Sequence, residues 1–137
     1  FEFEEIDEIS WEQAGNLPLA LLRPSMYERA IAEETFIQAG KRVIPKIESE
    51  SILHLMFQTQ FTELCTIIPS HYTRMPGLHS GTKALLLKDP IIRKGIGLFW
   101  LKTETVMPIT KIAEEVGQSL AENNELQKFL YREARCD

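Results

Sequence analysis

The spacing of apolar and polar positions changes along this chain, which is typical of a protein that mixes strands and helices. Residues 17–22 form an uninterrupted apolar run bounded by turn-forming residues, and this predicts a short strand buried on both faces. Apolar positions then recur at helical spacing over residues 31–39, and Gly40 stands where a left-handed residue often ends a helix. Residues 43–47 predict a second strand.

The helix between these strands carries its own start signal. Ser25 and Glu28 have the spacing of a capping box, in which each side chain satisfies a free backbone amide of the first turn. We therefore expect the helix to start here, with Met26 and Tyr27 exposed in its first turn. A strand, a helix and a strand in this order form a β-α-β unit, whose right-handed crossover makes the strands parallel.

The remaining elements continue this alternation. Ser10 is a candidate N-cap for a helical turn that Gly15 ends, and Pro108 is suited to the first turn of a later amphipathic helix. Further strands are expected over residues 1–9, 64–68, 84–87 and 95–102, and helical spacing returns over residues 126–130. Together these elements predict an α/β fold with a mainly parallel sheet and flanking helices.

One predicted helix is more apolar than its neighbours. Ser51 can cap a helix over residues 52–61, in which apolar side chains occupy more than one side. A chain this short has little core with which to surround such a helix. We therefore expect the helix to lie between two subunits, with Leu53, Met56 and Phe57 as interface residues.

The composition argues against several classes of function. The 137 residues include 15 Lys and Arg against 20 Asp and Glu, for a formal net charge of -5. The cations are scattered, so Arg29 and Arg42 are expected to be solvated, and the segment is not expected to bind DNA itself. No apolar run is long enough to span a membrane, and two distant cysteines make no disulfide framework. These features predict a cytoplasmic protein, and a first residue Phe1 suggests a piece of a longer chain.

The sequence contains few candidates for catalytic or metal-binding residues. His54, His71 and His79 lack the spacing of metal ligands, and Cys65 is expected in a core strand. We therefore predict no catalytic residue, no metal and no cofactor.

A helix start is the stronger candidate for a site. In open α/β sheets, ligands bind outside the carboxyl ends of the strands, where free helix amides attract anions. Ser25, Met26 and Tyr27 are thus candidate effector-binding residues, and Ser49 and Ser51 at the next helix start are weaker candidates. The alternative is that Ser25 only caps its helix.

Four stretches follow one another in an order that is known from a protein family. They are Arg29-Ala30-Ile31-Ala32 with Phe36 and Gly40, Pro45-Lys46-Ile47-Glu48 before Ser51-Ile52, Thr66-Ile67-Ile68-Pro69, and Gly97-Leu98-Phe99-Trp100 with Pro108. Through these stretches, residues 17–120 resemble the C-terminal effector-binding domain of LysR-type transcriptional regulators, a two-lobed fold similar to periplasmic solute-binding proteins. Thr62-Glu63-Leu64 departs from the family, which usually carries a Gly-x-Gly turn there.

The resemblance implies a sensor rather than an enzyme. Residues 1–14 would be a crossover strand and linker, residues 15–94 the second lobe, and residues 95–137 the returning strand and helices of the first lobe. A small anionic metabolite would be the effector of a homodimer or homotetramer that binds DNA through a separate winged helix-turn-helix domain absent from this chain. The alternatives are a stand-alone solute-binding lobe of a transport or receptor system, and a degenerate small α/β enzyme using His71 or Cys65.

Overall fold

The computed structural model describes residues 5–75, 77, 81–95, 97–101 and 107–124. The chain divides into two compact units, and it passes from the first, here called unit 1, to the second, unit 2, between Ile92 and Arg93. Unit 1 has the predicted fold class, with short parallel sheets and flanking helices.

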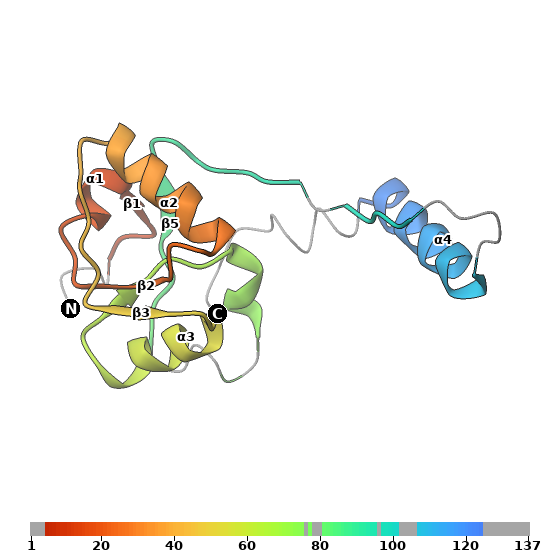
Figure 1. Ribbon diagram of the computed structural model, residues 1–137. Helices are drawn as coiled ribbons and strands as arrows, with labels where there is room; N and C mark the ends of the chain where they lie inside the picture. Colours follow the sequence, from red (N-terminus) through yellow and green to blue (C-terminus); the bar gives the residue numbers. More distant parts are fainter. Residues whose placement is uncertain (1–4, 76, 78–80, 96, 102–106, 125–137) are drawn as a thin grey trace. The chain divides into compact units, whose positions relative to one another are not determined.

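The larger sheet of unit 1 has the strand order β3-β2-β4, and all its strands are parallel (Figure 1). The central strand β2 (Leu19–Leu22) is buried along its whole length, as the apolar run predicts. The flanking strands are β3 (Ile47–Ser49) and β4 (Cys65–Thr66). The chain crosses from β2 to β3 through α2 (Tyr27–Gln38) and from β3 to β4 through α3 (Ile52–Phe61), so the predicted parallel β-α-β unit is confirmed.

The two faces of β2 belong to different hydrophobic clusters. Leu19 and Leu21 join Phe36 of α2 on one face, and Ala20 joins Leu55 of α3 on the other. Side chains alternate along a strand, so an uninterrupted apolar strand can be buried between two helices. Phe36 and Leu55, the largest fully buried side chains, lie on opposite faces and anchor the two helices.

A second, two-stranded sheet joins the two ends of unit 1. In it β1 (Glu8–Ser10) pairs in parallel with β5 (Leu86–Lys88). The next element after β1 is α1 (Trp11–Ala14), and the Trp11 indole Nε1 donates a hydrogen bond of 2.9 Å to the carbonyl of Pro90. The segment expected to be a crossover strand and linker therefore contributes Ile9, Trp11 and Ala14 to the core of unit 1.

Several predicted helix ends are confirmed. The Ser10 hydroxyl accepts a hydrogen bond from the Gln13 amide at 3.1 Å and so caps α1. The Ser51 hydroxyl accepts from the His54 amide at 3.3 Å and caps α3. Gly40 follows α2 with a φ of 72°, a backbone conformation that glycine adopts without a steric penalty.

Other boundaries differ from the predictions. The predicted strand over residues 43–47 was placed too early, because Pro45 has no amide hydrogen to donate and β3 starts only at Ile47. The Lys46 amide makes the first bond to β2, donating to the Leu19 carbonyl at 2.7 Å. Beyond the short β4, the chain forms a 3-10 helix, η1 (Ser70–Arg74).

The described helix of unit 2 is α4 (Pro108–Glu122), which begins with the predicted proline. Its apolar stripe is exposed at Ile109, Ile112 and Val116 within the described structure. No helix in the described part of either unit is long and apolar enough to cross a membrane.

The predicted strand over residues 95–102 is wrong at residue 95 and at residues 97–101, which form no strand. A strand requires a neighbour to satisfy its backbone hydrogen-bonding groups, and the described residues of unit 2 contain no strand. Residue 96, residue 102 and the predicted helix over residues 126–130 lie outside the described residues.

Candidate functional site

The ends of β2 and β3 and the starts of α2 and α3 lie together at one edge of the larger sheet. The backbone amide of Arg23 donates to the carbonyl of Ser49 at 2.9 Å and joins the segments that follow the two strands. The Arg23 guanidinium also forms an exposed ion pair with Glu50 at 2.9 Å. We call residues 23–27 and 49–54 the carboxyl edge, and the predicted effector-binding residues on it are Ser25, Met26, Tyr27, Ser49 and Ser51.

Ser25 does not cap α2, so the predicted capping box is wrong. The N-cap is Met26, which makes no side-chain capping hydrogen bond. The reason is a turn in which the Met26 amide donates to the Arg23 carbonyl at 2.9 Å, with Pro24 at the position that proline favours. The turn uses Ser25 before the helix begins. First-turn amides without a side-chain cap are the groups that attract anions at helix starts.

The other two predicted residues of this turn differ in exposure. Tyr27 is exposed, as expected. Met26 was expected to be exposed, but it is half-buried and packs against the cluster that contains Ala20 and Leu55. Tyr27 and the exposed Ser25 are therefore accessible to a ligand, whereas Met26 fastens the turn to the core.

The hydroxyls at the start of α3 are already engaged in a local network. Ser49 is buried, and its hydroxyl accepts from the Ser51 amide at 3.1 Å and lies 3.0 Å from Nδ1 of His54. The Gln58 amide nitrogen lies 3.0 Å from Nε2 of His54. With Gln58 as the donor to Nε2, the hydrogen sits on Nδ1 and points to Ser49. In this arrangement His54 fixes Ser49 in place and does not remove its proton.

Arg29 was expected to be solvated, but its side chain is buried. Its side chain is only 6% exposed, and Nη1 donates to the carbonyl of Leu22 at 2.8 Å and to Oε1 of Glu48 at 2.9 Å. Its Nε lies 3.7 Å from Oε2 of Glu33. Arg29 thus connects α2 to the last residue of β2 and to β3. Helical spacing could have found it, because position 29 shares a face with Ala32 and with position 36.

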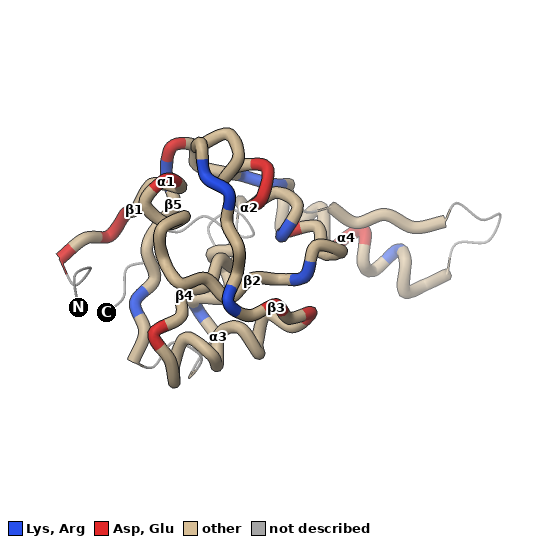
Figure 2. Tube along the Cα trace, turned by 60° about the vertical axis from the view of Figure 1, so that its left-hand side comes forward, with Lys and Arg blue, Asp and Glu red and all other residues tan. Residues whose placement is uncertain are grey.

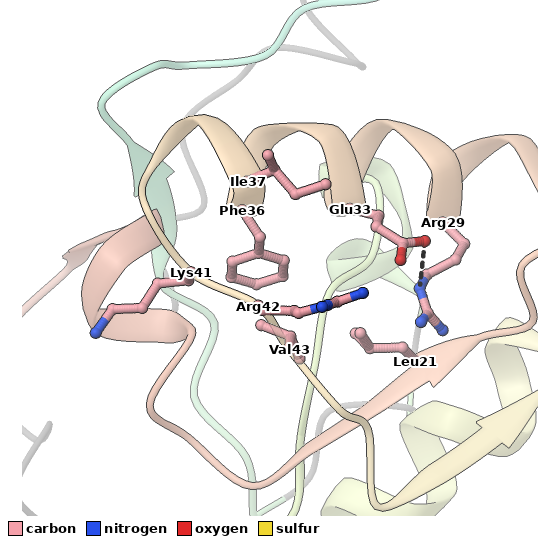
Figure 3. Close-up of a pocket in the computed structure, with 8 residues that line it drawn as sticks. All are labelled: Leu21, Arg29, Glu33, Phe36, Ile37, Lys41, Arg42 and Val43. Carbon is pink, nitrogen blue, oxygen red and sulfur yellow. Dashed lines mark ion pairs between the residues drawn. The ribbon is translucent and has the colours of Figure 1, made fainter.

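Beside Arg29 there is a small cavity between α2 and residues 41–43 (Figure 3). Its volume is about 90 Å³. Apolar and charged side chains both line it: Leu21, Phe36, Ile37 and Val43, with Arg29, Glu33, Lys41 and Arg42. This cavity is separate from the Ser25 turn, although Arg29 contacts the strand that leads into that turn.

The predicted interface residues on α3 do not share one environment. Leu53 and Phe57 are 42% and 48% exposed, whereas Met56 is 4% exposed and belongs to the core of unit 1. Met56 is therefore unavailable to a second subunit, and the predicted interface reduces to Leu53 and Phe57. The helix is apolar on two sides because one side faces β2.

The described residues contain no group of His, Cys, Asp and Glu side chains that could hold a metal ion. Comparisons of the chain with protein-family models, with curated proteins and with solved structures find no match.

The alternative of an enzyme using Cys65 or His71 finds no support in their surroundings. Burial raises the pKa of the Cys65 thiol above its ordinary value, whereas a reactive cysteine has a lowered pKa. The His71 ring lies against Tyr72, with ring centroids 4.5 Å apart. Neither feature provides an activated nucleophile.

Proposed function

We propose that unit 1 is the second lobe of a LysR-type effector-binding domain, which senses a small anionic metabolite and carries out no reaction. The observation that carries the proposal is the start of α2, where no side chain caps the helix and the turn lies directly beyond a buried parallel strand. Such amides, with the partial positive charge of the helix, suit a carboxylate or a similar anion. Their position at the carboxyl ends of parallel strands is where ligands bind in folds of this class.

In the proposed mechanism the anion accepts hydrogen bonds from the first turn of α2, and Ser25 and Tyr27 line the site. A ligand shifts the equilibrium between two arrangements of an assembly only to the extent that it binds one arrangement more tightly than the other. The proposed arrangements are two orientations of this lobe relative to the first lobe of a cytoplasmic homodimer or homotetramer. Promoter DNA would be bound by a separate winged helix-turn-helix domain. Acidic and basic residues are interspersed over the described parts of unit 1, which supports a role apart from DNA contact (Figure 2).

Replacing Ser25 with aspartate tests the anion site. Ser25 is exposed and caps nothing, so Ser25→Asp should change the free energy of unfolding by less than about 1 kcal/mol. The added carboxylate lies beside the proposed anion and should weaken its binding by at least about tenfold. Calorimetric titration of the 137-residue chain with a panel of inorganic anions and small mono- and dicarboxylates measures this effect.

Ser25→Asn is the matched control, because asparagine has nearly the shape of aspartate without its charge. The best ligand of the panel should bind this variant with close to the original affinity. An unchanged affinity in a folded Ser25→Asp variant would show that the anion site lies elsewhere.

The exposed side of α3 is the second element of the proposal. Phe57→Asp should leave unit 1 folded, because the side chain is about half exposed, and should shift the chain from dimer towards monomer. Sedimentation velocity over a range of protein concentrations measures the shift. Ile44→Asp is the matched control, since Ile44 is an exposed apolar residue outside α3 and should not alter the assembly. An unchanged sedimentation coefficient for folded Phe57→Asp would contradict the interface.

A further inference from the structure

The cavity beside Arg29 brings two guanidinium groups to one place. Arg29 uses Nη1 for the Leu22 carbonyl and for Glu48, and its Nε lies 3.7 Å from Glu33. The Arg42 side chain extends towards Arg29 and Glu33 in Figure 3. Among the described residues, no ion pair or hydrogen bond engages the Arg42 side chain. The lining therefore carries three cations, Arg29, Lys41 and Arg42, against one carboxylate, Glu33.

The other cation of the lining is directed elsewhere. The Lys41 Nζ donates to Oδ1 of Asn16 at 2.9 Å, and its side chain points away from Arg42 in Figure 3. An anion in the cavity would thus be held by guanidinium groups and not by an ammonium. Guanidinium forks match the planar, two-oxygen geometry of a carboxylate.

The rest of the lining restricts the size and the polarity of a ligand. Phe36 and Leu21 are buried beneath the cavity, and Ile37 and Val43 complete its apolar wall. A cavity of about 90 Å³ admits only a small ligand. The space suits a few carbon atoms attached to one small charged group.

We infer that this cavity is a binding site for a short-chain monocarboxylate. The carboxylate lies between Arg29 and Arg42, and the alkyl chain lies over Phe36 and Val43. The site is distinct from the carboxyl edge, and the inference does not depend on the proposed regulator function. A ligand here would be held by the same guanidinium that binds the Leu22 carbonyl at the end of β2.

Butyrate is the probe for this site. Titration of the 137-residue chain with sodium butyrate, followed by NMR, should produce saturable shifts of the Nε–H signals of Arg29 and Arg42 and of the Val43 methyl groups. The expected dissociation constant is on the order of 1 mM. Butanol and butylammonium share the alkyl chain but lack the carboxylate, and sodium chloride supplies ionic strength alone. None of these three should produce the same saturable shifts.

Arg42→Gln removes a cavity-lining cation at an exposed position and should weaken butyrate binding at least about tenfold. Lys41→Gln is the matched control, because it removes the neighbouring cation that points away, and it should leave the affinity unchanged. Ile37→Glu places a carboxylate at the rim on an exposed helix position and should weaken binding as well, even if Arg42→Gln fails to fold. Ser25→Asp should leave butyrate binding unchanged, which separates this site from the carboxyl edge.

The inference would be overturned by shifts that do not saturate, or by equal responses to butyrate and butylammonium. It would also be overturned if Lys41→Gln weakened binding as much as Arg42→Gln, or if a folded Ile37→Glu variant bound butyrate with the original affinity. Binding of another anion at the carboxyl edge bears only on the proposed function.

Discussion

Met56→Asp is expected to unfold unit 1. The Met56 side chain is only 4% exposed and belongs to the buried core. Burying an unpaired charge, or forcing its protonation, costs several kcal/mol. We expect a loss of at least about 4 kcal/mol from a total stability of about 5–15 kcal/mol. Far-ultraviolet circular dichroism with urea titration should show a lost or much weakened cooperative transition.

Two controls separate charge burial from other effects at this helix. Met56→Leu conserves the volume and should cost less than about 1.5 kcal/mol. Phe57→Asp introduces the same carboxylate at the next, exposed position and should remain folded. A native-like urea midpoint for Met56→Asp would show that Met56 faces solvent, as an interface residue would.

Arg29→Met is expected to lower the free energy of unfolding by about 2–3 kcal/mol, because the Leu22 carbonyl and Glu48 each lose a charged donor. Methionine keeps the helix propensity and much of the volume, so a cavity contributes little. The Glu48 carboxylate is 41% exposed and regains water when its partner is removed, which limits the cost. Thermal and urea unfolding of the purified variant measure the change.

Glu33→Gln is the comparison for Arg29. Its carboxylate is exposed and lies 3.7 Å from Nε, so its removal should cost less than about 1 kcal/mol. A stability of Arg29→Met within about 0.5 kcal/mol of the parent would contradict the structural role assigned to the buried guanidinium.

Local sequence signals predicted some helix starts and failed at others for an identifiable reason. Ser10 and Ser25 each have a carboxylate- or amide-bearing residue three positions later, yet only Ser10 forms a capping box. At Ser25 the preceding Pro24 favours a turn closed by the Met26 amide, and this turn competes with the cap. The uncapped start of α2, which carries the proposed function, was therefore not predictable from the serine itself.

At Arg29, the residue type suggested exposure, whereas its position on the helix indicated burial. Arg29 was expected to be solvated as one of several scattered cations, but it occupies the buried face of α2. The apolar run of β2 was predictable, since both of its faces are buried within unit 1. Residues 97–101 are comparably apolar but form no strand, because a strand depends on a neighbour that the pattern of one segment cannot specify.

The pairing of β1 with β5 sets Glu8 opposite Leu86, and the Trp11 indole reaches the backbone at Pro90. The two strands at the ends of residues 8–88 thus lie side by side and form one two-stranded ribbon. This is the geometry that domain insertion and circular permutation exploit, because joining or extending neighbouring ends leaves the core strands undisturbed.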